Sequence, residues 1–256
     1  MKTKVGGLGP FAVLSVVREL RRGGGDPRPL SVAGARELVP LLARELREGG
    51  EASAVVEQVL ENVAAVVWVG APDEAQLRRV DRAGVPIVAV TDADEVPYVL
   101  TTGVVHVPPG QGFPVATIAA AVAGRLGEDG TSLAARLPVL RRAVCDALIA
   151  SFAKRNGLVG AAVFVPGVDM PLLTLNQIRL VLRIALAYGE EVDNRRALEL
   201  LGVVGAGFGL RTVARELLDL VPVAGWALKG AIAYAGTRAV GEAAVRYFEA
   251  RSASTA

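Results

Sequence analysis

The stretch RNGLVGAAVFVPGVDMPLLTLNQIRLVLRIALAYG, from Arg155 to Gly189, holds the most specific pattern in this chain. It begins with small apolar residues and is interrupted by Pro166-Gly167. It then carries apolar residues at helical spacing, namely Leu172, Leu175, Ile178, Leu182 and Leu186. Asp169 stands where it can cap the second helix, with Pro171 in the first turn. The stretch therefore predicts two helices joined by a Pro-Gly turn.

Polar residues interrupt the second of these helices, and they form the candidate interaction or structural motif: Asp169, Asn176, Gln177, Arg179 and Arg183. Arg179 and Arg183 lie one helical turn apart, so they share a side of the helix. If that side faces other helices, Asp169 is a natural ion partner, because an isolated buried charge is costly. The alternatives are a grip on a phosphate or lipid headgroup, a solvated face, or an internal polar network.

The rest of the second half, residues 129–256, predicts an all-α domain that follows a boundary at Gly127 to Gly130. Apolar residues from Leu137 to Phe152 mark one face of a long helix, which we expect to end or break at Asn156-Gly157. Asp193 can cap a short helix through Leu201. The last helix runs from about Trp226 to Arg251. It carries alanines at intervals of four that predict a ridge for close helix packing: Ala231, Ala235, Ala239 and Ala243.

The first half alternates apolar runs with helical patterns. Strands are expected at Leu30–Ala33, Ala54–Val56, Ala64–Val69, Val85–Val90 and Val104–Val107, and helices at Ala35–Glu48, Pro72–Arg82 and Pro114–Leu126. This alternation predicts a Rossmann-like α/β domain with a mostly parallel, helix-covered sheet over residues 27–128. Residues 1–26 are expected to form a separate N-terminal amphipathic helix with a Gly23–Gly25 hinge.

Composition narrows the function classes. The 256 residues carry a net charge of +2 with basic and acidic residues interspersed, so nucleic acid is not an expected partner. One cysteine, Cys145, and one histidine, His106, exclude an internal disulfide and a multi-histidine metal centre. A cytoplasmic protein fits this composition. Met1–Lys4 and the apolar run to Val17 resemble a secretion signal, but the charged residues that follow favour an amphipathic helix.

The expected sheet has no recognisable phosphate loop, because neither G-x-x-x-x-G-K-[ST] nor G-x-G-x-x-G follows a strand. No G-x-S-x-G motif for acyl transfer is present either. The candidate cofactor-binding residues are therefore those that follow the later strands: Asp92, Asp94, Gly110 and Gly112. We expect no cofactor, no metal and no catalytic residues.

The segment from Ala64 to Asp94 resembles the back half of an Era-like GTPase domain. In that family a strand and a helix lead into a strand that ends in Asn-Lys-x-Asp, which reads the guanine base. Here the same place holds Thr91-Asp92-Ala93-Asp94, so that only Asp94 matches and Asp92 reverses the lysine's charge. The resemblance implies a degenerate, nucleotide-free relative of the GTPase domain.

A second resemblance covers roughly Leu133 to Phe248. Its motifs are PGVDMP at Pro166–Pro171, LNQ at Leu175–Gln177, AYG at Ala187–Gly189, VPVAGW at Val221–Trp226 and GTRA at Gly236–Ala239. They are similar to the domain of unknown function 697, a helical domain often fused behind Era-like GTPase domains and in some cases associated with bacterial membranes. That order of domains matches this chain.

Together these observations predict a non-enzymatic interaction or scaffold protein. It would combine a nucleotide-free, pseudo-GTPase-like domain with a helical domain for self-association or partner binding. Two alternatives stay open. One is a peripheral membrane protein at the inner face of the membrane, suggested by the high mean hydropathy of +0.42. The other is a degenerate nucleotide or metabolite sensor that uses Asp92, Asp94 and the Gly110–Gly112 loop.

Overall fold

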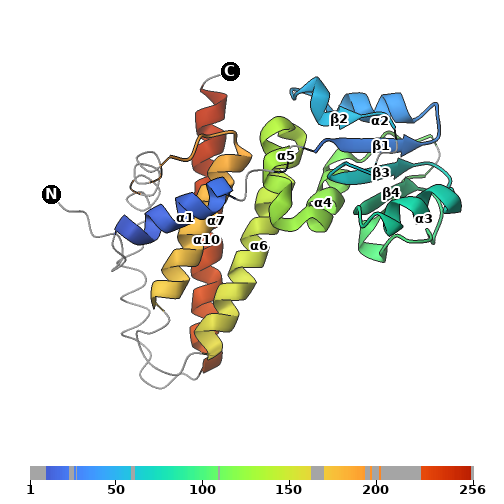
Figure 1. The fold of residues 1–256 in the computed structure, drawn as a ribbon. Coiled ribbons are helices and arrows are strands. Elements are labelled where there is room, and N and C mark those ends of the chain that lie inside the picture. The colour runs from blue at the N-terminus through green and yellow to red at the C-terminus, as the bar shows by residue number, and fades with distance from the viewer. Residues whose placement is uncertain are drawn as a thin grey trace. The chain divides into compact units, whose positions relative to one another are not determined.

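The computed structural model describes residues 10–22, 26, 28–58, 61–108, 110–162, 170–193, 197, 202 and 226–254 (Figure 1). The chain forms two compact units, Gly25–Ala147 and Met1–Gly24 together with Leu148–Ala256. The first unit is therefore inserted in the sequence of the second. The expected boundary at residues 128 and 129 falls inside the inserted unit, and the chain passes between the units within helix α6 (Pro138–Ala162).

The inserted unit is built on a five-stranded parallel sheet in the order β2-β1-β3-β4-β5. The strands are β1 (Leu30–Gly34), β2 (Val55–Val56), β3 (Ala65–Val69), β4 (Ile87–Thr91) and β5 (Val104–His106). All five confirm strands expected from the sequence, with ends that differ by at most two residues. Every residue of β3 and β4 is buried, as their uninterrupted apolar sequences predicted.

Helices cover both faces of this sheet. On one face α3 (Glu74–Arg82) packs Leu77 and Val80 into a core cluster with Trp68 and Ile87. Successive residues of a strand point to opposite faces of the sheet, so the strand residues next to Trp68 and Ile87 point to the second face. There α2 (Val39–Leu46) contacts β1 and β2, and α4 (Val115–Leu126) contacts β3, β4 and β5. Helix α5 (Gly130–Arg136) and the short 3-10 turns η1 (Ala52–Ala54), η2 (Thr101–Gly103) and η3 (Gly127–Asp129) complete the unit.

Helix α2 begins four residues later than the sequence predicted. Residues 35–38 form a tight turn in which the N–H groups of Leu38 and Val39 donate to the carbonyl of Ala35 at 2.9 and 3.0 Å. Pro40 then occupies the first turn of the helix, where its fixed φ angle favours a helix start. The sequence pattern alone did not distinguish this turn from a first helical turn.

The other unit is helical in the part that the structure describes. It contains α1 (Pro10–Arg22), the second half of α6, α7 (Met170–Ala187) and α10 (Trp226–Ala253) (Figure 1). The apolar side of α1, formed by Val13, Val16 and Val17, is buried, and α1 contacts α7. The amphipathic N-terminal helix is thus confirmed, and its apolar side is covered by protein. Pro166-Gly167 and most of the expected helix after Asp193 lie outside the described residues.

Two expectations about this unit are wrong. Helix α6 continues through Asn156-Gly157 to Ala162, because both residues serve contacts with other helices. A Cβ atom at Gly157 would lie 3.3 Å from the Gly230 carbonyl oxygen of α10, so the two helices approach closely there. The alanine ridge of α10 is not the packing surface, since Ala231, Ala235 and Ala239 are exposed and only Ala243 is buried. The buried face of α10 instead includes Gly230, Thr237, Gly241, Ala244 and Phe248.

This close approach predicts that alanine substitutions at two glycines of α10 have different effects on stability. A Cβ at Gly230 would lie 2.8 Å from the carbonyl oxygen of Gly157, whereas nothing lies within 4 Å of a Cβ at Gly236. Gly230→Ala and Gly236→Ala gain the same helix propensity, so their difference isolates the clash. We expect Gly230→Ala to be less stable than Gly236→Ala by about 1–3 kcal/mol in urea unfolding followed by circular dichroism. Equal stabilities would show that the helices are not in contact at Gly230.

Candidate functional site

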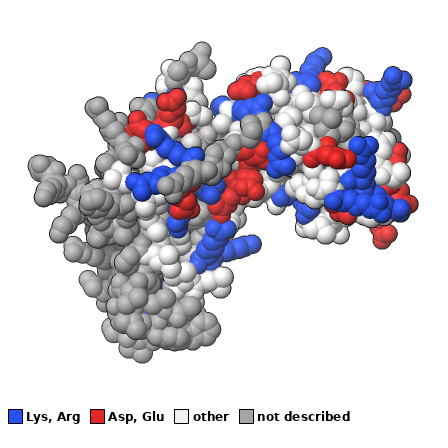
Figure 2. Space-filling model, in the orientation of Figure 1, with Lys and Arg blue, Asp and Glu red and all other residues white. Residues whose placement is uncertain are grey.

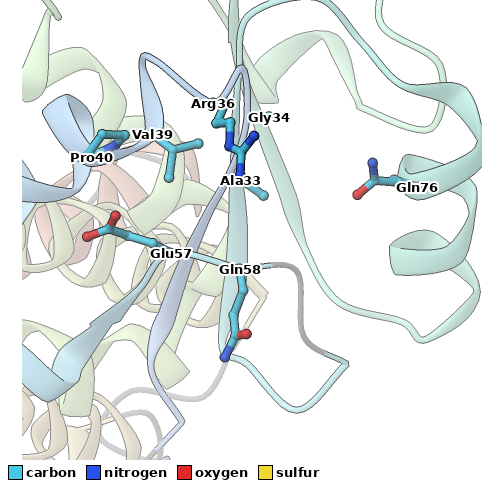
Figure 3. A pocket seen from close by; sticks show the side chains of 8 residues that line it. All are labelled: Ala33, Gly34, Arg36, Val39, Pro40, Glu57, Gln58 and Gln76. Atoms are coloured by element: carbon cyan, nitrogen blue, oxygen red, sulfur yellow. The ribbon is translucent and has the colours of Figure 1, made fainter.

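An open cleft lies where the strand order of the sheet reverses. The chain places β2 on one side of β1 and then crosses to place β3 on the other. In open parallel sheets, ligands bind beyond the carboxyl ends of the strands at this point. A cavity of about 370 Å³ is found there, lined by Ala33, Gly34, Arg36, Val39, Pro40, Glu57, Gln58 and Gln76 (Figure 3). The topology of the sheet thus positions the cleft.

Most polar groups around the cleft already have partners. The Glu57 carboxylate pairs with Arg47 at 2.7 Å, and the backbone carbonyl of Gln58 accepts a hydrogen bond from the Ser31 hydroxyl. The Gln76 amide donates to Asp73 at 2.9 Å. Arg36 is exposed, and it forms no hydrogen bond or ion pair with any residue that the structure describes. Its guanidinium is therefore the one charge on the lining that is not balanced within the described chain.

Asp73, the N-terminal cap of α3, does not line the cleft but holds Gln76, which does. Its side chain accepts hydrogen bonds from the backbone N–H groups of Gln76 and Ala75 at 3.1 and 3.0 Å. The pKa of Asp73 is lowered from its ordinary value, first by the backbone bond from Gln76 and then by that residue's side-chain amide. Both bonds favour the carboxylate form. Asp73 thus holds α3 and Gln76 in place and has little capacity left for a ligand.

Several backbone N–H groups in the turns after β1 and β3 donate hydrogen bonds to carbonyls of the protein. The Ala35 N–H donates to the Val69 carbonyl at 2.8 Å, and the Gly70 N–H donates to the Val90 carbonyl at 2.8 Å. Gly34 has a φ of +122°, and a Cβ there would lie 2.1 Å from the Val69 carbonyl oxygen. Gly34 is therefore required by the close approach of β1 and β3. A phosphate loop needs several free N–H groups, and three of those in this turn, on Ala35, Leu38 and Val39, are occupied, which leaves those of Arg36 and Glu37.

The cofactor candidates suggested by the sequence do not line this cleft. Asp92 and Asp94 are exposed in the loop after β4, where the Ala93 N–H donates to the Thr91 hydroxyl at 3.2 Å. Gly110 and Gly112 are exposed in the segment before α4, and nothing lies within 4 Å of a Cβ at either position. In the described part of the chain, no three His, Cys, Asp or Glu side chains come together to hold a metal.

The helical unit holds a buried polar cluster, formed by Asn156 of α6, Asn176 of α7 and Thr237 of α10. The Asn176 amide donates to the Asn156 side-chain oxygen at 2.7 Å, and the Asn156 amide donates to the Thr237 hydroxyl at 2.8 Å. Thr237 in turn donates to the Ala233 carbonyl at 2.8 Å. Asn156 and Thr237 are fully buried, so this chain of bonds links three helices.

The other members of the predicted motif are distributed along α7. Arg179 pairs with Glu19 of α1 at 2.7 Å, and Arg21 of α1 donates to the Val192 carbonyl at 3.1 Å. Gln177 and Arg183 are half-buried. Asp169, the expected partner of the arginines, lies outside the described residues. Arg179 therefore forms an ion pair with the N-terminal helix. The sequence did not suggest this contact, because Glu19 is 160 residues away.

Comparison with protein-family models, with curated proteins and with solved structures finds no match. None of the described helices is long and apolar enough to span a membrane. The interpretation of the site therefore depends on its geometry.

The buried polar cluster predicts that removal of the Thr237 hydroxyl lowers the free energy of unfolding. Thr237→Val keeps the side-chain shape but leaves the buried Asn156 amide without its acceptor, so we expect a loss of about 1–3 kcal/mol in the free energy of unfolding. In an Asn156→Ala background the same substitution should cost less, because no amide is left unsatisfied. Urea unfolding of the four proteins checks this. Identical costs in both backgrounds would show that the hydrogen bond contributes nothing.

Proposed function

We propose that this chain is a non-enzymatic interaction protein, with an α/β unit that does not bind nucleotide and a helical unit that self-associates or binds a protein partner. The single observation that carries this proposal is the turn after β1. The N–H groups of Ala35, Leu38 and Val39 there donate to carbonyls of the protein, and Gly34 is packed against β3. Phosphoryl transfer depends on positioned phosphate ligands, and this turn has no lysine and only the N–H groups of Arg36 and Glu37 left as backbone donors.

The same proposal includes the resemblances to the domain of unknown function 697 and to a degenerate Era-like domain. Two further observations support an interaction role. In the helical unit, Leu158 and Leu172 expose 71% and 44% of their surface. Exposed leucines on neighbouring helices are suited to contact with another protein. Acidic and basic side chains are intermixed on the visible face (Figure 2), which favours a protein partner over a polyanion.

We place the protein in the cytoplasm as part of this proposal. Peripheral membrane binding through α1 would require that helix to leave α7, since Val13, Val16 and Val17 are buried. Separation would also break the Arg179–Glu19 ion pair. The structure therefore favours α1 as a packed element of the helical unit over α1 as a lipid anchor.

Nucleotide binding tests the proposal directly. Calorimetric titration of the full chain with GDP or GTP, in the presence of Mg²⁺, should give no saturable heat up to about 1 mM nucleotide, which corresponds to binding weaker than about 4 kcal/mol. A dissociation constant in the micromolar range would contradict the proposal, because it would require more phosphate ligands than the partly occupied turn after β1 is expected to offer.

Self-association through the helical unit makes a separate prediction. If Leu158 lies in a contact between copies, Leu158→Gln should shift the protein toward the monomer in light scattering coupled to size exclusion. Leu41→Gln is the matched control, because Leu41 is 54% exposed on α2 of the α/β unit. A wild-type protein that is already monomeric at about 100 μM, well above ordinary dimer affinities, would restrict the proposal to a different partner.

A further inference from the structure

The cleft at the carboxyl ends of β1 and β3 has no role in the function proposed above. We propose that it binds a small molecule that carries one oxyanion group, a carboxylate or a phosphate monoester, on a compact apolar body. This inference goes beyond the proposed function and does not depend on what the helical unit binds.

Charge indicates the oxyanion. Glu57 is neutralised by Arg47 at 2.7 Å, whereas Arg36 projects into the cleft without a partner in the described chain (Figure 3). A guanidinium presents parallel N–H donors that match the two oxygens of a carboxylate or phosphate. The N–H groups of Ala35, Leu38 and Val39 in the turn are occupied, which leaves those of Arg36 and Glu37 as backbone donors. The Arg36 side chain supplies the one positive charge on the lining that has no partner in the described chain, which suits one oxyanion group and not a polyphosphate.

The remaining surface indicates the rest of the ligand. Ala33, Val39 and Pro40 provide an apolar wall, and Figure 3 shows Gln76 across the cleft from Val39 and Pro40. The Gln76 amide nitrogen is engaged by Asp73, which leaves its oxygen as an acceptor. The volume of about 370 Å³ is near the lower limit of ligand pockets. A ring or short chain fits this space.

Three probes with the same ring separate these contributions. Benzoate carries a carboxylate, phenyl phosphate carries a phosphate monoester, and benzamide is neutral. We would titrate each into the isotope-labelled full chain and follow the backbone amide signals of Gly34 and Gln76, which line the cleft. Gly84 serves as the reference, since it does not line the cleft. We expect saturable shifts at Gly34 and Gln76 with at least one anion and none with benzamide.

Variants assign the binding to Arg36. Arg36→Gln should weaken anion binding by about tenfold or more, and Arg36→Lys should fall between it and the wild type, because lysine keeps the charge but not the paired donors. Arg82→Gln, which removes an exposed arginine outside the cleft, should leave binding unchanged. Whether benzoate or phenyl phosphate binds more tightly identifies the class of oxyanion.

The outcomes also separate this inference from the proposed function. The inference is overturned if neither anion shifts the cleft signals, if benzamide binds as tightly as the anions, or if Arg36→Gln binds like the wild type. A parallel titration with GDP addresses the other question. GDP binding much tighter than that of phenyl phosphate contradicts a nucleotide-free α/β unit. Failure of benzoate and phenyl phosphate alone leaves the nucleotide-free proposal intact.

Discussion

The close approach of β1 and β3 at Gly34 is the constraint on which the α/β unit depends. A side chain at Gly34 would collide with the Val69 carbonyl, and the φ of +122° is unfavourable for any residue with a Cβ atom. With glycine in place, the Ala35 N–H reaches Val69 and the chain enters the turn of residues 35–38 that leads into α2. The cleft lies beside this turn, and the contact occupies one of the backbone donors that a phosphate could use.

Much of the α/β unit could be predicted because its strands are short, uninterrupted apolar runs. Ala65–Val69 and Ile87–Thr91 are buried on both faces, and a run of this kind has few alternatives to a central parallel strand. The start of α2 was misplaced because a tight turn and a helical turn share the same residue preferences. The strand order, and with it the cleft, was not accessible from the sequence, since Arg36, Glu57 and Gln76 come from separate segments without a shared motif.

The helical unit was harder to predict for a related reason. Asn156-Gly157 has the local character of a helix end, yet the helix continues because Asn156 bonds to Asn176 and Thr237. Local propensity is overridden when tertiary contacts satisfy the polar groups. The alanines at intervals of four in α10 suggested the wrong face, since such spacing occurs on any alanine-rich helix. The glycines that permit close approach are recognisable only once their partner helix is known.

The insertion of one unit in the other has a consequence for synthesis of the chain. Helix α1 leaves the ribosome before the α/β unit, but its partner α7 begins only at Met170, after the whole α/β unit has been made. The α/β unit can collapse around its own sheet during this interval, while the buried side of α1 waits for contacts that arrive later. With this order of elements, the apolar side of α1 can be buried only after α7 has been synthesised. During that interval, Val13, Val16 and Val17 of the nascent chain form an apolar surface suited to a chaperone.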